Sequence, residues 1–280
     1  MTAELGILNK SAVALAADSA VTITNRKGEK IYNSANKLFS LSKCHPIGIM
    51  VYGSAELSGV PWETIIKIYR KVLDTRSFDT VKEYAEDFFR FLQENENYIF
   101  PDNVVQSGLE KVVFQFLTLQ RDKLEYNLQL AFEGSDDEYE LFFEEEEDID
   151  PEKVINVLKS NVKTKLSEFA ESEYLPHFDI DDVQKIIESQ EEMITKVIKF
   201  LFKNLPVDEE IMSDLITMVA YYLCKDVFTN QFSGIVVAGF GELETFPYLF
   251  SYIVECKVGN KLKYKNEDTK DATISNDVEG

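Results

Sequence analysis

The first fifty residues consist largely of short runs of small and apolar residues separated by polar turns. Four of these runs predict β-strands, at residues 3–8, 11–17, 37–42 and 47–52. Asn9 and Lys10 separate the first two runs, a pair typical of a tight turn between antiparallel strands. The last run, IGIMVY, is nearly all apolar, which indicates a strand buried on both faces. The chain therefore opens with a four-strand segment, which any fold assigned to it has to contain.

Two amphipathic helices are predicted to follow these strands. Apolar residues recur at intervals of three and four over residues 62–73, directly after Pro61, a residue suited to a first helical position. A second apolar stripe covers residues 81–92, and Thr80 and Glu83 before it have the spacing of a capping box. Both stripes are typical of helix faces that pack on a core.

The middle of the chain has a different composition. Residues 111–132 alternate apolar and polar residues around the charged triplet RDK, which predicts a β-hairpin. Residues 133–152 contain twelve acidic residues and no basic one, as in a solvated loop; a docking site for a basic partner is the alternative. Residues 151–230 have a helical pattern and are expected to form about three helices.

Strands are predicted again near the end of the chain, at residues 234–239 and 248–255, and the polar segment that follows is expected to be loose. These elements predict a domain organisation in three parts: a core at 1–100 and 232–258, an insertion at 101–231 that holds the hairpin, the acidic run and the helices, and a polar tail at 259–280.

The composition restricts the classes of function. Apolar residues make up 45% of the chain, with 20 Phe and 13 Tyr, as expected for a folded core. The formal charge is −21, from 29 Lys and Arg against 50 Asp and Glu. A chain this acidic repels phosphate backbones, so nucleic acid is not an expected partner.

The sequence also argues against a membrane span, disulfide bonds and a histidine-rich metal site. No apolar run approaches the roughly 20 residues that cross a bilayer, and the first residues do not have the pattern of a signal peptide. The three cysteines are far apart, which is typical of unpaired thiols in a reducing compartment. His45 and His177 are the only histidines, too few for a histidine-rich metal site. We expect a cytoplasmic protein without a membrane partner and without a cofactor.

Thr2 directly follows Met1, so removal of Met1 would make it the N-terminal residue. It would then carry a hydroxyl group and a free α-amine, whose pKa in model peptides is roughly 7.7–8.0. An N-terminal amine is a known activator of a threonine nucleophile.

The N-terminal segment resembles the start of proteasome-type β subunits and of the bacterial peptidase that pairs with an unfoldase ring. In that family a nucleophilic threonine opens the chain, and a strand hairpin leads to a motif of the form A-A-D-S-x-x-T. Residues 16–22, AADSAVT, match this motif, and the interval from Thr2 to Asp18 is that of the family. Lys37 in NKLFSL takes the place of the family's lysine at the head of the third strand, after a polar loop at 25–29 that makes the interval slightly longer.

The resemblance covers about residues 2–95 and 232–258, including MVYGSA before the first helix and a later aromatic-rich strand pair at 235–255. It implies an α+β N-terminal-nucleophile hydrolase, a four-layer αββα sandwich, here with a helical insertion. Family members continue with further strands and helices that supply a serine and an aspartate near the threonine. We expect that C-terminal part to be missing here.

The resemblance also implies a role for each matching residue. Thr2 attacks the carbonyl carbon, Lys37 stabilises the developing negative charge, and Asp18 holds Lys37 in position. A backbone N–H at Gly53 would stabilise the oxyanion. The family has a glycine where Tyr52 stands, so either the geometry differs at Tyr52 or the alignment shifts by one and Gly53 takes the role.

Three further residues have two interpretations each. Ser19 and Thr22 are turn and strand residues, or Ser19 hydrogen-bonds near the site and Thr22 contacts substrate. Met50 is a core residue or lines the pocket for the substrate residue before the cleaved bond. Tyr52 is also predicted to bind substrate.

The sequence therefore predicts a threonine peptidase that cleaves polypeptides, assembles into a homo-oligomeric ring and is a candidate partner of an ATP-dependent unfoldase. Two alternatives remain open. One is a catalytically inactive scaffold subunit of the same fold, suggested by Tyr52, the large acidic insertion and the missing C-terminal part. The other is an amidase that acts on small molecules with the same chemistry.

Overall fold

The structure is a computed structural model that describes residues 4–18, 21–25, 28–32, 36–94, 99–133, 151–271 and 278–279. The chain divides into two compact units, Met1–Gly108 with Asn230–Gly280, and Leu109–Thr229. Each unit has its own set of secondary structure elements and is described separately below.

A five-stranded antiparallel sheet forms the centre of the first unit, in the order β11-β10-β9-β6-β5. Its strands are β5 (Leu38–Ser40), β6 (Ile47–Gly53), β9 (Ser233–Gly239), β10 (Tyr248–Val258) and β11 (Lys261–Asp271). β6 and β9 lie in the middle, so the apolar run of β6 is buried as predicted. Strands from the two ends of the chain therefore pair directly in this sheet.

A second sheet contains the N-terminal hairpin, β1 (Glu4–Asn9) and β2 (Ala12–Ala17), with β12 (Val278–Glu279) beside β1. The side chain of Asn9 accepts hydrogen bonds from the backbone N–H groups of Ser11 and Ala12, both at 2.9 Å, which fixes the predicted turn. Two short ribbons complete the strands of this unit, β3 (Val21–Asn25) with β4 (Gly28–Tyr32) and β7 (Glu56–Leu57) with β8 (Val60–Pro61).

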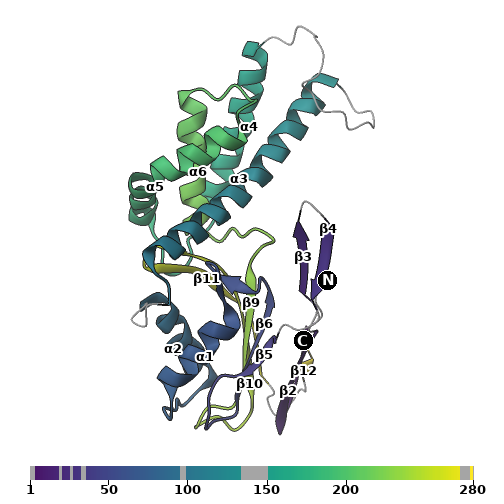
Figure 1. The fold of residues 1–280 in the computed structure, drawn as a ribbon, viewed down its shortest axis with the longest axis vertical. Helices are drawn as coiled ribbons and strands as arrows, with labels where there is room; N and C mark the ends of the chain where they lie inside the picture. Colours follow the sequence, from purple (N-terminus) through teal and green to yellow (C-terminus); the bar gives the residue numbers. More distant parts are fainter. Residues whose placement is uncertain are drawn as a thin grey trace. The chain divides into compact units, whose positions relative to one another are not determined.

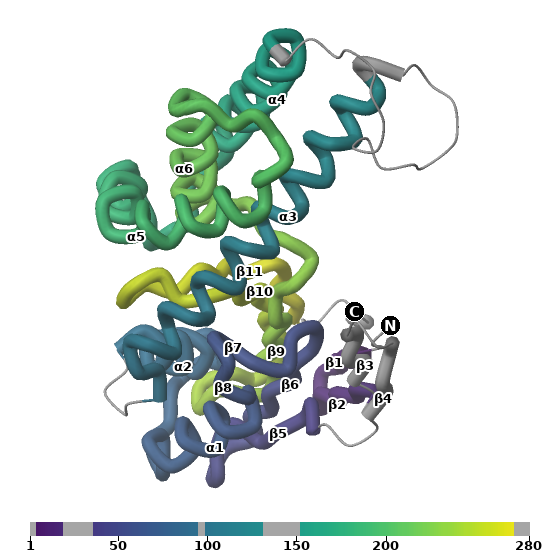
Figure 2. Tube along the Cα trace, turned by 45° about the horizontal axis from the view of Figure 1, so that its top comes forward, coloured from purple at the N-terminus to yellow at the C-terminus, as the bar shows by residue number. Residues whose placement is uncertain are grey.

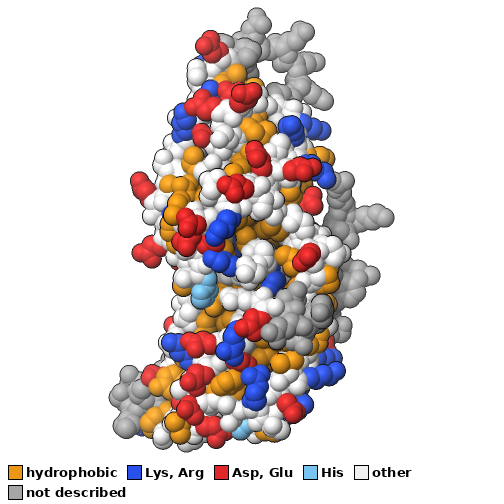
Figure 3. All heavy atoms as spheres, turned by 90° about the vertical axis from the view of Figure 1, so that its left-hand side faces the viewer, with side chains coloured by type: hydrophobic (Ala, Val, Ile, Leu, Met, Phe, Trp, Pro, Cys, Tyr) orange, Lys and Arg blue, Asp and Glu red, His pale blue; other side chains and the backbone are white. Residues whose placement is uncertain are grey.

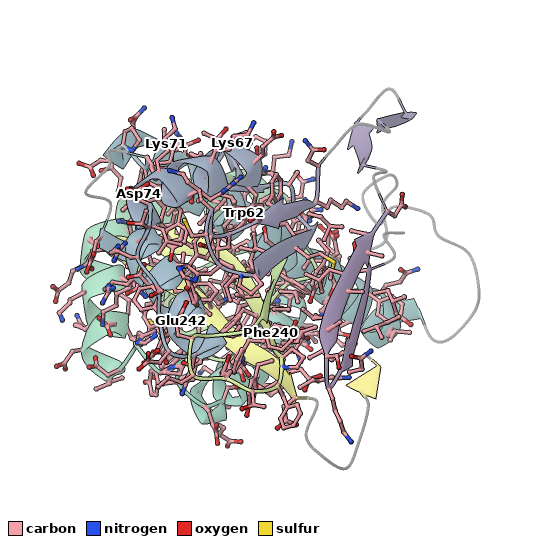
Figure 4. All side chains as sticks on the ribbon, turned by 90° about the horizontal axis from the view of Figure 1, so that it is seen from below. Trp62, Lys67, Lys71, Asp74, Phe240 and Glu242 are labelled. Atoms are coloured by element: carbon pink, nitrogen blue, oxygen red, sulfur yellow. The ribbon has the colours of Figure 1, made fainter. Side chains whose placement is uncertain are left out.

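Helices α1 (Trp62–Leu73) and α2 (Val81–Glu94) cover one face of the five-stranded sheet (Figure 1). Both predicted apolar stripes are confirmed as core-facing, because they supply much of the buried cluster against this face. The capping box at the start of α2 is also confirmed: Thr80 N–H donates to Glu83 at 3.0 Å, and Glu83 N–H donates to Thr80 at 3.2 Å. Lys67 and Lys71 point away from the sheet on the outer face of α1 (Figure 4).

The N-terminal hairpin packs on the opposite face of the five-stranded sheet through a smaller apolar cluster. Its buried members are Leu8, Met50, Val236, Ala238 and Leu249. The described part of this unit is therefore a mixed α+β structure with a helix layer, an antiparallel sheet and a second sheet. A second helix layer is not among its described residues.

The second unit is helical. It contains α3 (Asp102–Glu133) from Leu109 onward, α4 (Pro151–Glu171), α5 (Ile180–Leu201) and α6 (Glu209–Cys224). α6 packs against both α4 and α5 (Figure 2), and the rings of Phe116 and Tyr222 stack at 4.0 Å. The three helices predicted within residues 151–230 are confirmed.

The β-hairpin predicted at residues 111–132 is wrong, because these residues lie within α3. The buried positions of α3 follow the three-to-four residue spacing of a helix: Leu109, Val112, Val113, Phe116, Leu117, Gln120, Leu124 and Leu128. β-branched and aromatic residues favour a strand prediction, but their spacing suits a helix face. The RDK triplet is one turn of this helix and not a hairpin turn.

The prediction of a loose tail from residue 259 is also wrong for its first half. Lys261–Asp271 forms β11 and pairs along its length with β10, after a turn in which Gly259 has φ of 60°. The exposed residues of this strand, 266–269, are polar or charged, so the sequence gives little indication of a strand. Edge strands commonly carry charged residues, which prevent unwanted pairing. Most of the acidic run at 133–152, namely residues 134–150, lies outside the described residues.

Candidate functional site

The side chains of three predicted site residues are not among those that the structure describes. Thr2 and Ser19 lie outside the described residues, and Thr22 lies in β3 with its side chain outside the described set. The remaining predicted residues are Asp18, Lys37, Met50, Tyr52 and Gly53, all in the first unit. Asp18, Lys37 and Tyr52 each interact with Glu4 at the start of β1, and Gly53 follows Tyr52 at the end of β6.

Lys37 is held at the head of β5 by the sheet itself. Its carbonyl oxygen accepts a hydrogen bond from Val51 N–H of β6 at 2.8 Å, so its backbone position is fixed beside the buried strand. Only 9% of its side chain is exposed, and its Nζ lies 3.7 Å from Oε1 of Glu4. That contact is an ion pair too long for a hydrogen bond, and Nζ has no hydrogen-bond partner among the described residues. Lys37 therefore has a buried ammonium group whose donor capacity is not used by any described residue.

Glu4 is the first residue of β1 and is paired with Ala17, which immediately precedes Asp18. Its side chain is 14% exposed. Burial raises the pKa of the Glu4 carboxyl; the Lys37 ammonium opposes this rise, and the Asp18 carboxylate adds to it. Glu4, Asp18 and Lys37 thus interact electrostatically at the open end of the N-terminal hairpin.

Gly53 ends β6 with its backbone N–H on the β5 side of the sheet. Hydrogen bonds from Leu41 N–H to Ile47 and from Val51 N–H to Lys37 show that residues 47 and 51 face β5. Backbone groups alternate between the two neighbours of an antiparallel strand, so Gly53 faces the same way. Its φ is 71°, and a Cβ atom there would lie 2.4 Å from the carbonyl oxygen of Phe232, which explains the glycine.

Tyr52 has the opposite orientation, with its backbone facing β9 and its ring packed over Gly234. A Cβ atom on Gly234 would lie 1.8 Å from the Tyr52 ring, so this glycine provides the space that the ring occupies. The Tyr52 hydroxyl donates to Oε2 of Glu267 in β11 at 3.2 Å. Burial and the nearby carboxylate of Glu267 raise the pKa of Tyr52, although a hydrogen bond with Ser251 opposes the rise. Tyr52 is therefore a protonated donor at neutral pH.

Met50 is 3% exposed and lies in the apolar cluster between the two sheets, beside Leu8 and Val236. An open groove of about 670 Å³ lies near this cluster, and its lining includes Leu38, Phe39 and His45. β5 is the edge strand of its sheet, and the hydrogen bonds of Lys37 and Leu41 to β6 leave Leu38 and Ser40 facing outward. The groove lining also includes Ser11 and Ala12 at the turn of the hairpin, the end opposite Glu4, and the edge of β5 has no strand partner among the described residues.

Glu4 is the main site residue that sequence reasoning missed. A glutamate at the start of an apolar strand run, two positions after Thr2, was the available signal, because residues two apart share a face of a strand. The hydrogen bond from Tyr52 to Glu267 was not predictable, since the polar sequence of residues 261–271 indicates a loose tail.

The surface adds little to the choice of partner. On the face drawn in Figure 3, Lys and Arg side chains are interspersed with Asp and Glu, without a broad basic patch among the residues shown. In the described ranges, no group of three or more His, Cys, Asp and Glu residues is arranged to hold a metal ion. None of the described helices is long and apolar enough to cross a bilayer.

Comparison with protein-family models, with curated proteins and with solved structures gave no match. The candidate site is therefore interpreted from its own geometry and from the residues of its sequence motif.

Proposed function

We propose that this chain is an N-terminal-nucleophile hydrolase of proteasome type, in which Thr2 becomes the first residue and cleaves peptide bonds. The helix, sheet and sheet layers of the first unit would be three layers of an αββα sandwich. The observation that carries the proposal is the buried Lys37 ammonium beside Glu4, with donor capacity that no described residue uses. Buried charges without hydrogen bonds are costly, so such a group indicates a partner that the reaction supplies.

The covalent chain limits how far Thr2 can lie from Glu4, the residue that pairs with this ammonium group. Thr2 precedes Glu4 by two residues, and two extended residues span at most about 7 Å. A positive charge there lowers the energy of an oxyanion on the threonine side chain and favours an unprotonated α-amine. The backbone N–H of Gly53 lies on the Lys37 side of β6, and that of Tyr52 faces β9. Gly53 is therefore the better oxyanion donor of the two.

The proposed reaction has two halves. The Thr2 hydroxyl oxygen attacks the peptide carbonyl carbon while the α-amine, through a water molecule, accepts the hydroxyl proton. The C–N bond then breaks, the proton passes to the departing amine, and an ester links Thr2 to the acyl fragment. Water attacks this ester with the same amine as base, which releases the acid and regenerates the hydroxyl.

A polypeptide substrate is favoured over a small amide by the groove beside β5. The outward-facing backbone groups of β5 can pair with an extended chain, and the lining of the groove is largely apolar. Assembly into a ring and delivery of substrate by an ATP-dependent unfoldase are further parts of the proposal, and they rest on the sequence resemblance alone.

Replacement of Lys37 by methionine tests the proposal. We expect Lys37→Met to lower kcat/KM for a fluorogenic peptide by about 100-fold or more, because loss of one transition-state donor typically has this effect. Lys43→Met is the matched control, since Lys43 is an exposed lysine that pairs with Asp74. Unchanged turnover in Lys37→Met, with a retained circular dichroism spectrum, would refute the role of Lys37. Turnover of small amides without peptides would indicate the amidase alternative.

A further inference from the structure

We propose that Glu4 is a positioning residue of this reaction, which holds the Lys37 ammonium in place and sets the pH at which the Thr2 amine becomes free. This inference rests on the proposed function, since it assigns Glu4 a role in the same site. The sequence motif assigns the positioning of Lys37 to Asp18 alone.

The contact between Glu4 and Lys37 depends on charge. Oε1 of Glu4 and Nζ of Lys37 are 3.7 Å apart, and both atoms are buried without a hydrogen-bond partner in the described part of the chain. Attraction between unit charges at this distance is several-fold stronger near a protein interior than in bulk water. A neutral side chain of the same shape at position 4 would therefore remove most of the attraction while it kept the packing.

The surroundings of Glu4 contain more negative than positive charge. Its neighbours include Asp18 after β2, Lys37 before β5, and Tyr52 in β6, which lies next to Glu267 of β11. The polar residue that β10 contributes beside Tyr52 is the neutral Ser251. Lys37 is the one cation in this set of described groups, so a change at Glu4 alters the balance of charge around it directly.

The sign of the effect on the Thr2 amine follows from the charges. A carboxylate near an amine favours its protonated form, and an ammonium group favours its neutral form. Only Ala3 separates Glu4 from Thr2, so the two Cα atoms can lie at most about 7 Å apart. Removal of the Glu4 charge should therefore free the amine at lower pH, and should also loosen Lys37 and slow the reaction.

The test measures how fast an electrophile selective for N-terminal threonine forms an adduct, followed by intact mass between pH 5 and 9. The wild-type chain is compared with Glu4→Gln, Glu4→Asp and the control Glu63→Gln, which removes an exposed carboxylate on α1. In Glu4→Gln we expect the half-maximal pH to fall by about one unit, as for charges a few ångströms apart, and the plateau rate to fall roughly tenfold. Glu4→Asp should show a smaller shift in the same direction, and Glu63→Gln should match the wild type.

The outcomes separate this inference from the function on which it rests. A wild-type chain that forms no adduct would overturn both the proposed function and the role of Glu4. An adduct with the wild-type half-maximal pH in Glu4→Gln would overturn the role of Glu4 alone. If thermal unfolding shows that Glu4→Gln does not fold, a wild-type half-maximal pH in Glu4→Asp would overturn it instead.

Discussion

At the scale of the residue, the candidate site depends on side chains and backbone groups that the sheet holds in fixed positions. The backbone of Lys37 is held by the hydrogen bond that its carbonyl oxygen accepts from Val51 N–H. The position of Gly53 is fixed by the pairing of β6 with β9. Asp18 and Lys37 remain predictions from the motif, and the structure places both beside Glu4. Glu4 was not predictable from the motif, since its contact with Lys37 joins residues 33 positions apart and depends on how the hairpin lies over the sheet.

Substitution of Gly53 tests the backbone geometry at the end of β6. Gly53→Ala should destabilise the fold by about 2 kcal/mol or more, because it combines an unfavourable φ with a 2.4 Å approach to the Phe232 oxygen. Gly59→Ala is the matched control, since Gly59 also has positive φ, but no atom lies within 4 Å of the position that a Cβ would take there. Denaturant unfolding should show a smaller loss for the control; equal losses would show that the Phe232 contact contributes nothing.

At the scale of the element, local periodicity predicted most of the first unit. The helices at 62–73 and 81–94 and the buried strand β6 follow from the spacing of their apolar residues, which needs no long-range information. The prediction for α3 failed because its β-branched and aromatic residues favour strands locally, while its burial pattern is helical only when read over several turns. The prediction for β11 failed because its strand character comes from pairing with β10 more than from its own residues.

The capping box of α2 provides a test at this scale. Thr80→Ala should lower the free energy of unfolding by about 1 kcal/mol, because it leaves the Glu83 N–H without its side-chain acceptor. Thr118→Ala is a control, since Thr118 is a partly exposed threonine within α3 whose hydroxyl donates to the Phe114 carbonyl of the preceding turn. Denaturant unfolding should show little loss for Thr118→Ala, and a loss at Thr80 no greater than this would contradict the role of the cap.

At the scale of the whole molecule, the chain combines an α+β unit that carries the candidate site with a separate helical unit. The site is assembled entirely within the first unit, from its N-terminal hairpin and its five-stranded sheet. The pairing of β6 with β9 unites segments that are about 180 residues apart, as Gly53 with Ser233 shows, and no local pattern predicts such a pairing. The two ends of the chain are therefore both required to build the sheet that positions Lys37.

The proposal that Thr2 is an N-terminal nucleophile is tested by the intact mass of the purified chain, before and after exposure to an electrophile that captures N-terminal threonine. We predict a mass without Met1 and a gain of one adduct located on Thr2, absent in Thr2→Ala at an unchanged melting temperature. Retention of Met1, or a free Thr2 that forms no adduct in the folded wild-type chain, would contradict the proposal.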